Sequence, residues 1–519
     1  MQSSRGSHAG FPRLSWCAGW IPDVALVGLA VLLRIAFYVP LALFPLDSDG
    51  VLAGLCAFRI EAGQHPFFFP GGSRLSSASC YVAATFFHLV GPSRFALGLT
   101  GLFWAILTFA FVIVFLRTVL PPTWARVSFL FAAVAPEQVV TVTYIPWAYG
   151  EILASCGATL SIAALYHARQ TRWLLAALGV SIGLGLWFSL QTLMVAIPTL
   201  IWLARLGVLR QRGSMPLGFG LIVGSSPFWV GNIVLGFPSI LHNWASRPSS
   251  PNGILDNAVY LVTTTAPGLL FHGFTSWHSA VIIFGYILLS IGIVLSLRRE
   301  SADRSRALVF LATLIALFAA ALFCFSQAGS MRGWTVRYIL PMFFAALIYF
   351  GVGASALWRR SKAVAVLACV AVILPNLFLY SLPGSIARNR LTNALEEDAR
   401  LRNILASRGV EVLYGDYFLV YHENFDSRET LKAIPAYDKS DYLNYRDSIS
   451  QKAARVAMLG SLQDVTGWAK LARVRGTVQR LDGGQWLFVS SHAIQKPRLF
   501  VRLLQRNCNI GSCLAPFPD

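Results

Sequence analysis

The sequence predicts a polytopic α-helical membrane protein with a small extracytoplasmic α/β or α+β domain at its C-terminus. The chain is 56% hydrophobic and only 13% charged, and its mean hydropathy is +0.60, whereas soluble proteins carry about 25% charged residues. Apolar runs long enough to cross about 30 Å of hydrocarbon recur along it. A closed β-barrel would instead show short segments of alternating hydrophobicity, and these runs do not alternate.

The apolar runs predict about eleven membrane spans. They lie at residues 23–44, 96–116, 125–145, 151–167, 173–188, 190–205, 216–236, 278–297, 306–326, 337–355 and 363–382. The first run is too long for a cleavable signal and lacks a small-residue cleavage site, so it is expected to stay as a signal anchor.

Basic residues fall in every second loop between these spans. They include Arg117, Arg126, Arg169, Arg172, Arg210, Arg212, Arg298, Arg299, Arg359 and Arg360. This asymmetry predicts an N-in, C-out orientation. It also explains the net charge of +19, because such side chains meet anionic lipid headgroups. Nucleic-acid binding is not expected, since no compact basic domain with aromatic platforms is present.

This orientation places three segments outside, at about residues 45–95, 237–277 and 383–519. The first contains two apolar patches, Val51–Ile60 and Tyr81–Val90, which are expected to form short helices lying in the membrane interface. The second, rich in Pro, Ser and aromatic residues, is expected to be a loop. The chain is thus predicted to divide into a membrane domain at 1–382, which includes the first outer loop, and an outer domain at 383–519.

The outer tail shows strand signals. Alternating stretches occur at Val410–Tyr414 and Trp486–Val489, and Asp482–Gly484 is a turn signal. Cysteines outside the membrane can pair in an oxidising compartment, which makes Cys56 with Cys80 and Cys508 with Cys513 candidate disulfides. No spacing matches a zinc site.

Asp47 and Asp49 are the foremost catalytic candidates. Carboxylates are scarce, with 23 Asp and Glu residues in 519, yet two lie just past the first span. A glycosyl transfer needs a base that takes the proton from the attacking hydroxyl. The alternative is a solvated loop acid or a helix cap.

Further polar candidates lie near the predicted outer ends of spans. Glu151, beside Tyr149, is either a dipole-stabilised acid or a cavity-facing one. Arg337 suits a phosphate, or snorkels to headgroups. Asn232 fits a sugar hydroxyl or a helix–helix hydrogen bond. Arg34, inside the first span, needs a partner or a wet cavity.

Taken in order, these motifs resemble a bacterial branch of the glycosyltransferase C superfamily, related to protein mannosyltransferases and aminoarabinose transferases. Where the family reads D-S-D-E-A-x-x-G-L, this chain has Asp47–Leu55. Where it reads F-Y-G-Q-x-Y-M-G-S-L-E-A-Y, this chain has Phe69–Tyr81. Further landmarks follow in the same order at Gly185–Trp187, Ser226–Trp229 with Asn232, Arg337–Pro341 and Tyr414–Tyr421.

The resemblance implies a polyprenyl-phosphate sugar donor, a glycan, lipid or protein acceptor, and inverting transfer on the outer face of the bacterial cytoplasmic (inner) membrane. It makes Asp49 the catalytic carboxylate, supported by Asp47 or Glu151. The substrate-binding candidates are Arg337, Tyr149, Asn232, Arg74 and Tyr81. No cofactor is expected, and a requirement for a divalent cation is left open.

The chain departs from the family pattern at three polar positions. The family's Glu, Gln and Glu are Gly50, Gly72 and Ser79 here. Three interpretations remain open: a different acceptor, a takeover by Asp47 and Glu151, or loss of catalysis. The rival functions are a transporter or flippase of lipid-linked saccharides, which would favour inverted repeats and broken spans, and an inactive scaffold for envelope assembly.

Overall fold

A computed structural model describes residues 19–493. It leaves out residues 44–47, 71, 145–148, 208, 210–213, 241–250, 272–276, 299–302, 327–334, 382–398, 416, 436–453, 462–464, 467–468, 470–474 and 482–484. Cys508 and Cys513 therefore lie outside the described residues, as do Asp47 and the turn signal at 482–484.

The chain forms two compact units. The helical unit comprises Met1–Phe37, Leu102–Tyr144 and Tyr149–Ser381. The mixed unit comprises Tyr38–Gly101, Ile145–Ala148 and Leu382–Asp519. This division groups the first predicted outer loop with the tail, whereas the division from sequence groups that loop with the membrane region.

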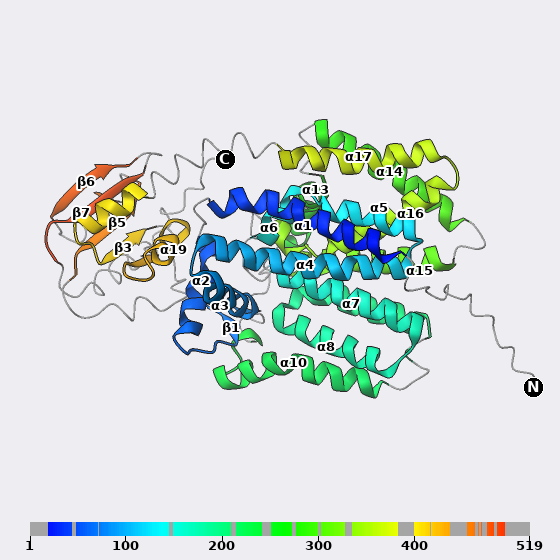
Figure 1. Ribbon diagram of the computed structural model, residues 1–519, viewed down its shortest axis with the longest axis horizontal. Helices are drawn as coiled ribbons and strands as arrows, with labels where there is room; N and C mark the ends of the chain where they lie inside the picture. Colours follow the sequence, from blue (N-terminus) through cyan, green and yellow to red (C-terminus); the bar gives the residue numbers. More distant parts are fainter. Residues whose placement is uncertain are drawn as a thin grey trace, which may run out of the picture. The chain divides into compact units, whose positions relative to one another are not determined.

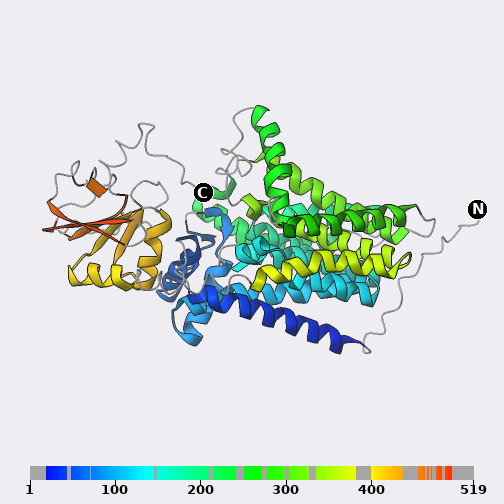
Figure 2. The same cartoon turned by 90° about the horizontal axis from the view of Figure 1, so that it is seen from above.

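The longer helices of the helical unit run side by side (Figures 1 and 2). The helices that lie in this unit wholly or in part are α1 (Trp20–Leu43), α4 (Arg94–Val119), α5 (Pro122–Ala133), α6 (Glu137–Tyr144), α7 (Tyr149–Arg169), α8 (Arg172–Phe188), η1 (Leu190–Thr192), α9 (Leu193–Arg205), α10 (Met215–Leu235), α12 (Pro251–Tyr260), η2 (Leu261–Thr265), α13 (Ala266–Phe271), α14 (Trp277–Leu297), α15 (Asp303–Phe325), η4 (Thr335–Tyr338), α16 (Met342–Trp358) and α17 (Lys362–Ser381). Every predicted span coincides with helix.

Six helices among the described residues are long and apolar enough to cross a membrane, and a seventh span results if the bent pair α5 and α6 is counted as one. Five shorter apolar helices accompany them. The total of about eleven spans and the N-in orientation stay predictions.

The prediction of a loop at residues 237–277 is wrong for part of this range. Its second half is helical, and Gly253–Phe271 is itself long and apolar enough to span a membrane. Pro251 occupies the first helical position, where its missing N–H costs nothing. Polar residues that mask the apolar pattern bond to neighbouring elements: Asn257 Nδ2 donates to Cys324 O at 3.1 Å, and the Thr265 and Thr335 hydroxyls lie 2.9 Å apart.

The bend of 65° between α5 and α6 has a local cause. Pro136 lacks an N–H and disfavours helical backbone at Ala135, so α5 ends just before Ala135.

Arg34 is buried, and its Nη2 donates to the Ala132 carbonyl oxygen at 3.5 Å. Its guanidinium also lies 5.4 Å from the centre of the Phe109 ring. Arg34 thus has the partner that the sequence analysis required.

The start of α1 is held by a buried ion cluster. Asp23 is 1% exposed and lies 3.1 Å from Arg117 Nε and 2.8 Å from Arg126 Nε. Arg126 also donates to the Gly19 carbonyl oxygen at 2.9 Å. The predicted first span is thereby tied to the end of α4 and the start of α5.

Two glycines set the distance between α8 and α10. A Cβ atom at Gly179 would lie 2.2 Å from Leu217 O, and one at Gly220 would lie 2.0 Å from Ala176 O. Small residues allow this close backbone approach, which is a common way for helices to associate in membranes.

The mixed unit contains a helical hairpin and a sheet. Helices α2 (Ser48–Glu61) and α3 (Ala78–Val90) flank the short antiparallel pair β1 (Phe68–Phe69) and β2 (Gly72–Ser76). A Cys56–Cys80 disulfide joins the two helices. Both predicted helices are present, but Val51, Leu52, Ala53 and Leu55 are fully buried. The predicted interfacial placement of α2 is therefore wrong at this part of the helix, since an interfacial helix exposes one face.

The tail forms a five-stranded mixed sheet in the order β4-β3-β5-β7-β6. The strands are β3 (Val412–Gly415), β4 (Lys432–Pro435), β5 (Val456–Gly460), β6 (Gly476–Arg480) and β7 (Trp486–Ser490). β3 is parallel to β4 and β5, whereas β7 is antiparallel to β5 and β6. Helix α19 (Tyr417–Asp426) connects β3 to β4. The strands predicted near Val410–Tyr414 and Trp486–Val489 are confirmed, and the tail contains both helix and strand as predicted.

Candidate functional site

The predicted site residues divide between the two units. Asp49, Arg74 and Tyr81 fall in the mixed unit, whereas Tyr149, Glu151, Asn232 and Arg337 fall in the helical unit. Asp47 lies outside the described residues.

Asp49 lies in the first turn of α2. Amide dipoles at a helix start stabilise a negative charge there, which is compatible with a structural acid and with an ionised base. The helix is held firmly, because its residues from Gly50 to Ala57 are buried. Side-chain contacts of Asp49 and Arg74 are outside what the structure describes; Arg74 lies in β2.

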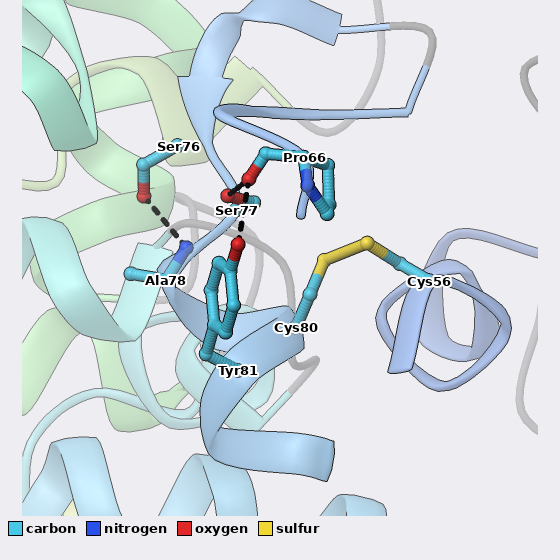
Figure 3. Close-up of a disulfide and its surroundings, with 7 residues drawn as sticks. All are labelled: Cys56, Pro66, Ser76, Ser77, Ala78, Cys80 and Tyr81. Carbon is cyan, nitrogen blue, oxygen red and sulfur yellow. Dashed lines mark hydrogen bonds between the residues drawn. A yellow bond between two sulfur atoms is a disulfide. The ribbon is translucent and has the colours of Figure 1, made fainter. Parts of the chain in front are cut away.

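Tyr81 holds the turn that precedes α3 (Figure 3). Its hydroxyl donates to Pro66 O at 3.3 Å, and the Ser77 hydroxyl donates to the same oxygen. Burial raises the pKa of the Tyr81 phenol, which therefore stays protonated as a donor. Ser79, which replaces a family Glu, is fully buried beside the disulfide.

Tyr149 and Glu151 begin α7 and are both buried, Glu151 completely. The helix start presses against α4, because a Cβ atom at Gly150 would lie 2.8 Å from the Trp104 Cβ. Glu151 thus lies in the first turn of a helix, as one of its two sequence interpretations requires, and it is buried there. A carboxylate removed from water needs compensating partners, which makes Glu151 a functional candidate on physical grounds.

A small cavity of about 30 Å³ lies beside this helix start, lined among others by Arg34, Thr108, Thr143 and Gly150.

Asn232 closes the end of α10. Its Nδ2 donates to Phe228 O at 2.9 Å, and its Oδ1 accepts from the Ser239 backbone N–H at 3.3 Å and from the Ser239 hydroxyl. The Gly236 N–H donates to Asn232 O from a left-handed backbone conformation, which is a common helix C-cap. These bonds give Asn232 a capping role within its own segment.

Arg337 lies half-buried in η4. Its Nη2 donates to the Tyr338 hydroxyl at 3.1 Å, and its guanidinium carbon lies 5.0 Å from the centre of that ring. Tyr338 thus orients the guanidinium, whose planar fork of donors suits a phosphate.

Within the described part of the chain, no three His, Cys, Asp or Glu side chains gather as metal ligands.

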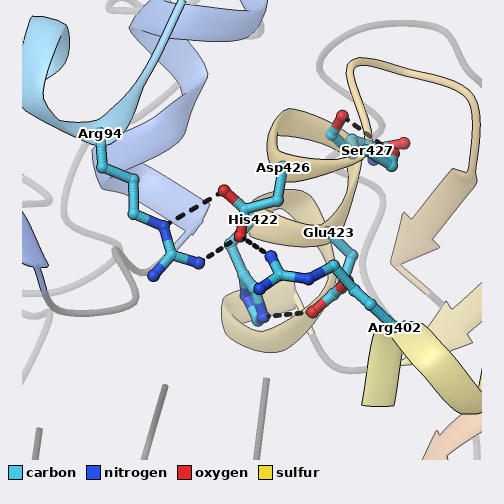
Figure 4. A network of polar contacts seen from close by, with 7 residues as sticks. Arg94, Arg402, His422, Glu423, Asp426 and Ser427 are labelled. Carbon is cyan, nitrogen blue, oxygen red and sulfur yellow. Dashed lines mark hydrogen bonds and ion pairs between the residues drawn. The ribbon is translucent and has the colours of Figure 1, made fainter. Parts of the chain in front are cut away.

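Arg94, Asp426 and Arg402 form polar contacts that are not predicted from the sequence, as do His422 and Glu423 (Figure 4). No local signal could have revealed the contact between Arg94 and Asp426, because these residues are 332 positions apart.

The chain shares its fold with a solved structure of a membrane protein, ArnT. The chain overlaps with the crystal structure of ArnT from Cupriavidus metallidurans bound to undecaprenyl phosphate, with a TM-score of 0.60 and 14% identity over 91% of this chain and 98% of that one. Among the described residues, the apolar helices agree with a multi-pass membrane protein. The resemblance seen in the sequence is confirmed at the level of fold.

Two further structures overlap less well. ArnT in the apo state gives a TM-score of 0.48 at 16% identity, over 91% of this chain and 98% of that one. The Archaeoglobus fulgidus oligosaccharyltransferase AglB, in complex with an inhibitory peptide and a dolichol-phosphate, gives 0.45 at 12% identity, over 93% and 77%. No protein-family model matches the sequence, and no curated protein matches it.

Proposed function

We propose that the protein is a membrane glycosyltransferase that moves a sugar from a polyprenyl-phosphate donor to an envelope acceptor, with inversion. The observation that carries this proposal is the overlap with ArnT bound to undecaprenyl phosphate, over 91% of the chain. The order of the motifs from Asp47 to Tyr421 supports it independently.

In this reaction the acceptor hydroxyl oxygen attacks the anomeric carbon as the bond to the donor phosphate breaks. Asp49 takes the hydroxyl proton, with Asp47 or Glu151 in support, and the polyprenyl phosphate leaves. Because the leaving group is already a phosphate, stabilising its charge is the larger task. Arg337, held by Tyr338, is the residue for this task.

The remaining candidates have unequal support. Tyr149 is buried next to Glu151 and Arg74 lies in the strand before α3. Asn232 and Tyr81 already make bonds that maintain the fold, so smaller effects on transfer are expected from them.

The proposed location is the outer face of the bacterial cytoplasmic membrane. The Cys56–Cys80 disulfide supports it, because disulfides persist in oxidising compartments outside the cytoplasm. The basic loops support the same orientation.

The test uses purified protein in nanodiscs with radiolabelled polyprenyl-phosphate sugars and an envelope extract as acceptor. Donor consumption is followed for the natural protein, Asp49→Asn and the control Asp303→Asn, whose side chain is 88% exposed. We expect turnover to vanish in Asp49→Asn alone. Turnover that persists in Asp49→Asn would exclude this base and keep the enzyme class. No consumption of any donor would favour the transporter or scaffold, and an EDTA arm reports on divalent cations.

A further inference from the structure

The carboxylate of Asp426, in the tail, accepts hydrogen bonds from two arginines of the mixed unit (Figure 4). Arg94, at the start of α4, donates from Nε to Asp426 Oδ1 at 3.2 Å and from Nη2 to Asp426 Oδ2. Arg402, in the helix at 399–407, donates to the same Oδ2. The Arg94 and Asp426 side chains are 13% and 11% exposed. A two-pronged pair this well shielded from solvent fixes geometry as well as supplying energy.

An aromatic contact lies directly beside this charge contact. Phe425, also on α19, stacks on Phe58 of α2 with ring centres 5.5 Å apart, and its centre lies 5.9 Å from that of Phe87 of α3. A Cβ atom at Gly54 of α2 would lie 2.5 Å from the Phe425 ring. The ring therefore rests directly on the α2 backbone, one and a half turns after Asp49.

The same end of α19 is anchored to the sheet. Asn424 Nδ2 donates to Ala433 O at 2.6 Å, and Ala433 N donates to Asn424 Oδ1 at 2.8 Å. Three consecutive residues thus have separate partners: Asn424 holds β4, Phe425 holds α2, and Asp426 holds Arg94. The sheet is coupled to α2 through one short segment.

Helix α2 depends on such support. At 14 residues, it is at the length where isolated helices are marginal in water. The disulfide ties it to α3 at Cys56, seven positions after Asp49.

We propose that Asn424, Phe425 and Asp426 are positioning residues that hold α2, and with it Asp49, in place for proton transfer. This inference rests on the proposed function. It assigns the tail a part in catalysis, because any displacement of its sheet is passed to the helix that carries the base. Misplacement of a reacting group by about 1 Å can cost about 100-fold in rate.

The test combines kinetics with hydrogen exchange on the full chain in nanodiscs. Arg94→Gln and Phe425→Ala remove the two contacts, and Phe425→Leu serves if the alanine variant does not fold. Arg94→Lys keeps the charge. The control is Arg408→Gln, which removes an exposed arginine hydrogen bond, to the Thr477 hydroxyl, within the sheet region.

We expect kcat to fall about 100-fold in Arg94→Gln and Phe425→Ala, with an unchanged KM for the donor. Amide exchange should rise over residues 48–61 and stay unchanged in α14, and Arg94→Lys should restore part of both. Unchanged exchange over 48–61, or faster exchange with natural kcat, would overturn the inference and leave the proposed function standing. A fully active Asp49→Asn variant would overturn it by removing the base to be positioned. A natural protein that consumes no donor would overturn both.

Discussion

The sulfur atoms of Cys56 and Cys80 are bonded, and their Cα atoms lie 5.6 Å apart, so that α2 and α3 form one covalently closed hairpin. The closed segment separates the two cysteines by 24 positions. It carries the strands β1 and β2 and lies just after the candidate base. The hairpin is therefore the part of the candidate site whose stability can be tested most directly.

Opening this disulfide should destabilise the mixed unit. For a loop of this length, loss of the cross-link costs about 3 kcal/mol through the unfolded state. We expect Cys56→Ser with Cys80→Ser to lower the Tm of the detergent-purified protein and to mimic treatment with dithiothreitol. Cys369→Ser, at a free cysteine, is the control. An equal Tm in the double variant and the natural protein would contradict the prediction.

Asp23→Ala should be strongly destabilising. It leaves Arg117 and Arg126 partly buried without the carboxylate that both contact, and breaking a buried ion pair from one side costs about 3–5 kcal/mol. Thermal unfolding in detergent checks this. Asp303→Ala is the matched control, because Asp303 is exposed and pairs only with Arg306 among the contacts described. Similar unfolding temperatures for the two variants would refute it.

Gly220→Ala should loosen α10 from α8. The added methyl would clash with the Ala176 carbonyl oxygen, and overpacking of this kind costs about 1–3 kcal/mol. Gly218→Ala on the same helix meets nothing within 4 Å, so it should be neutral or slightly stabilising through helix propensity. Unfolding by increasing concentrations of a denaturing detergent, without guanidinium, compares the stabilities of the two variants. A Gly220→Ala variant as stable as Gly218→Ala would show that the helices are not in close backbone contact.

Arg337→Gln should weaken the use of donor if this residue binds the phosphate. Charge-assisted hydrogen bonds contribute about 1.5–3 kcal/mol, so kcat/KM should fall about 10- to 100-fold. Tyr338→Phe should have a smaller effect in the same direction, since it removes the hydroxyl that orients the guanidinium. Arg306→Gln, at an exposed arginine that contacts the Leu297 carbonyl, is the control. Natural kinetics in Arg337→Gln would exclude the phosphate role.

Much of the helical architecture was predictable because it depends on local composition. Every predicted apolar run overlaps one or more helices in the described residues, and Arg34 has a buried partner as its position required. The helix at Pro251–Phe271 was missed because Asn, Asp and Thr residues interrupt its apolar pattern. A hydropathy pattern contains no information on the hydrogen bonds that Asn257 and Thr265 make to other elements.

The candidate site was predictable only in part. The order of the motifs indicated the fold, the candidate acids and the candidate arginine. The positions of Asp49 and Glu151 at helix starts follow from neighbouring residues. The capping bonds of Asn232 depend on the path of the chain after α10. The burial of Glu151 depends on the approach of α7 to Trp104. Neither contact has a sequence pattern, because spacing between segments is set by packing.

By itself, the sequence determined that this protein is a multi-pass helical chain with strands in its C-terminal tail and acids past its first predicted span. Hydropathy and helix-start chemistry act over a few residues and can be read directly. Only the tertiary structure decided that Phe425 packs against the helix that carries Asp49 and that Asp426 pairs with Arg94 at the start of α4. Their partners lie more than 300 positions away, and contacts at that distance arise only when the whole chain has folded and the cost of closing long loops has been met.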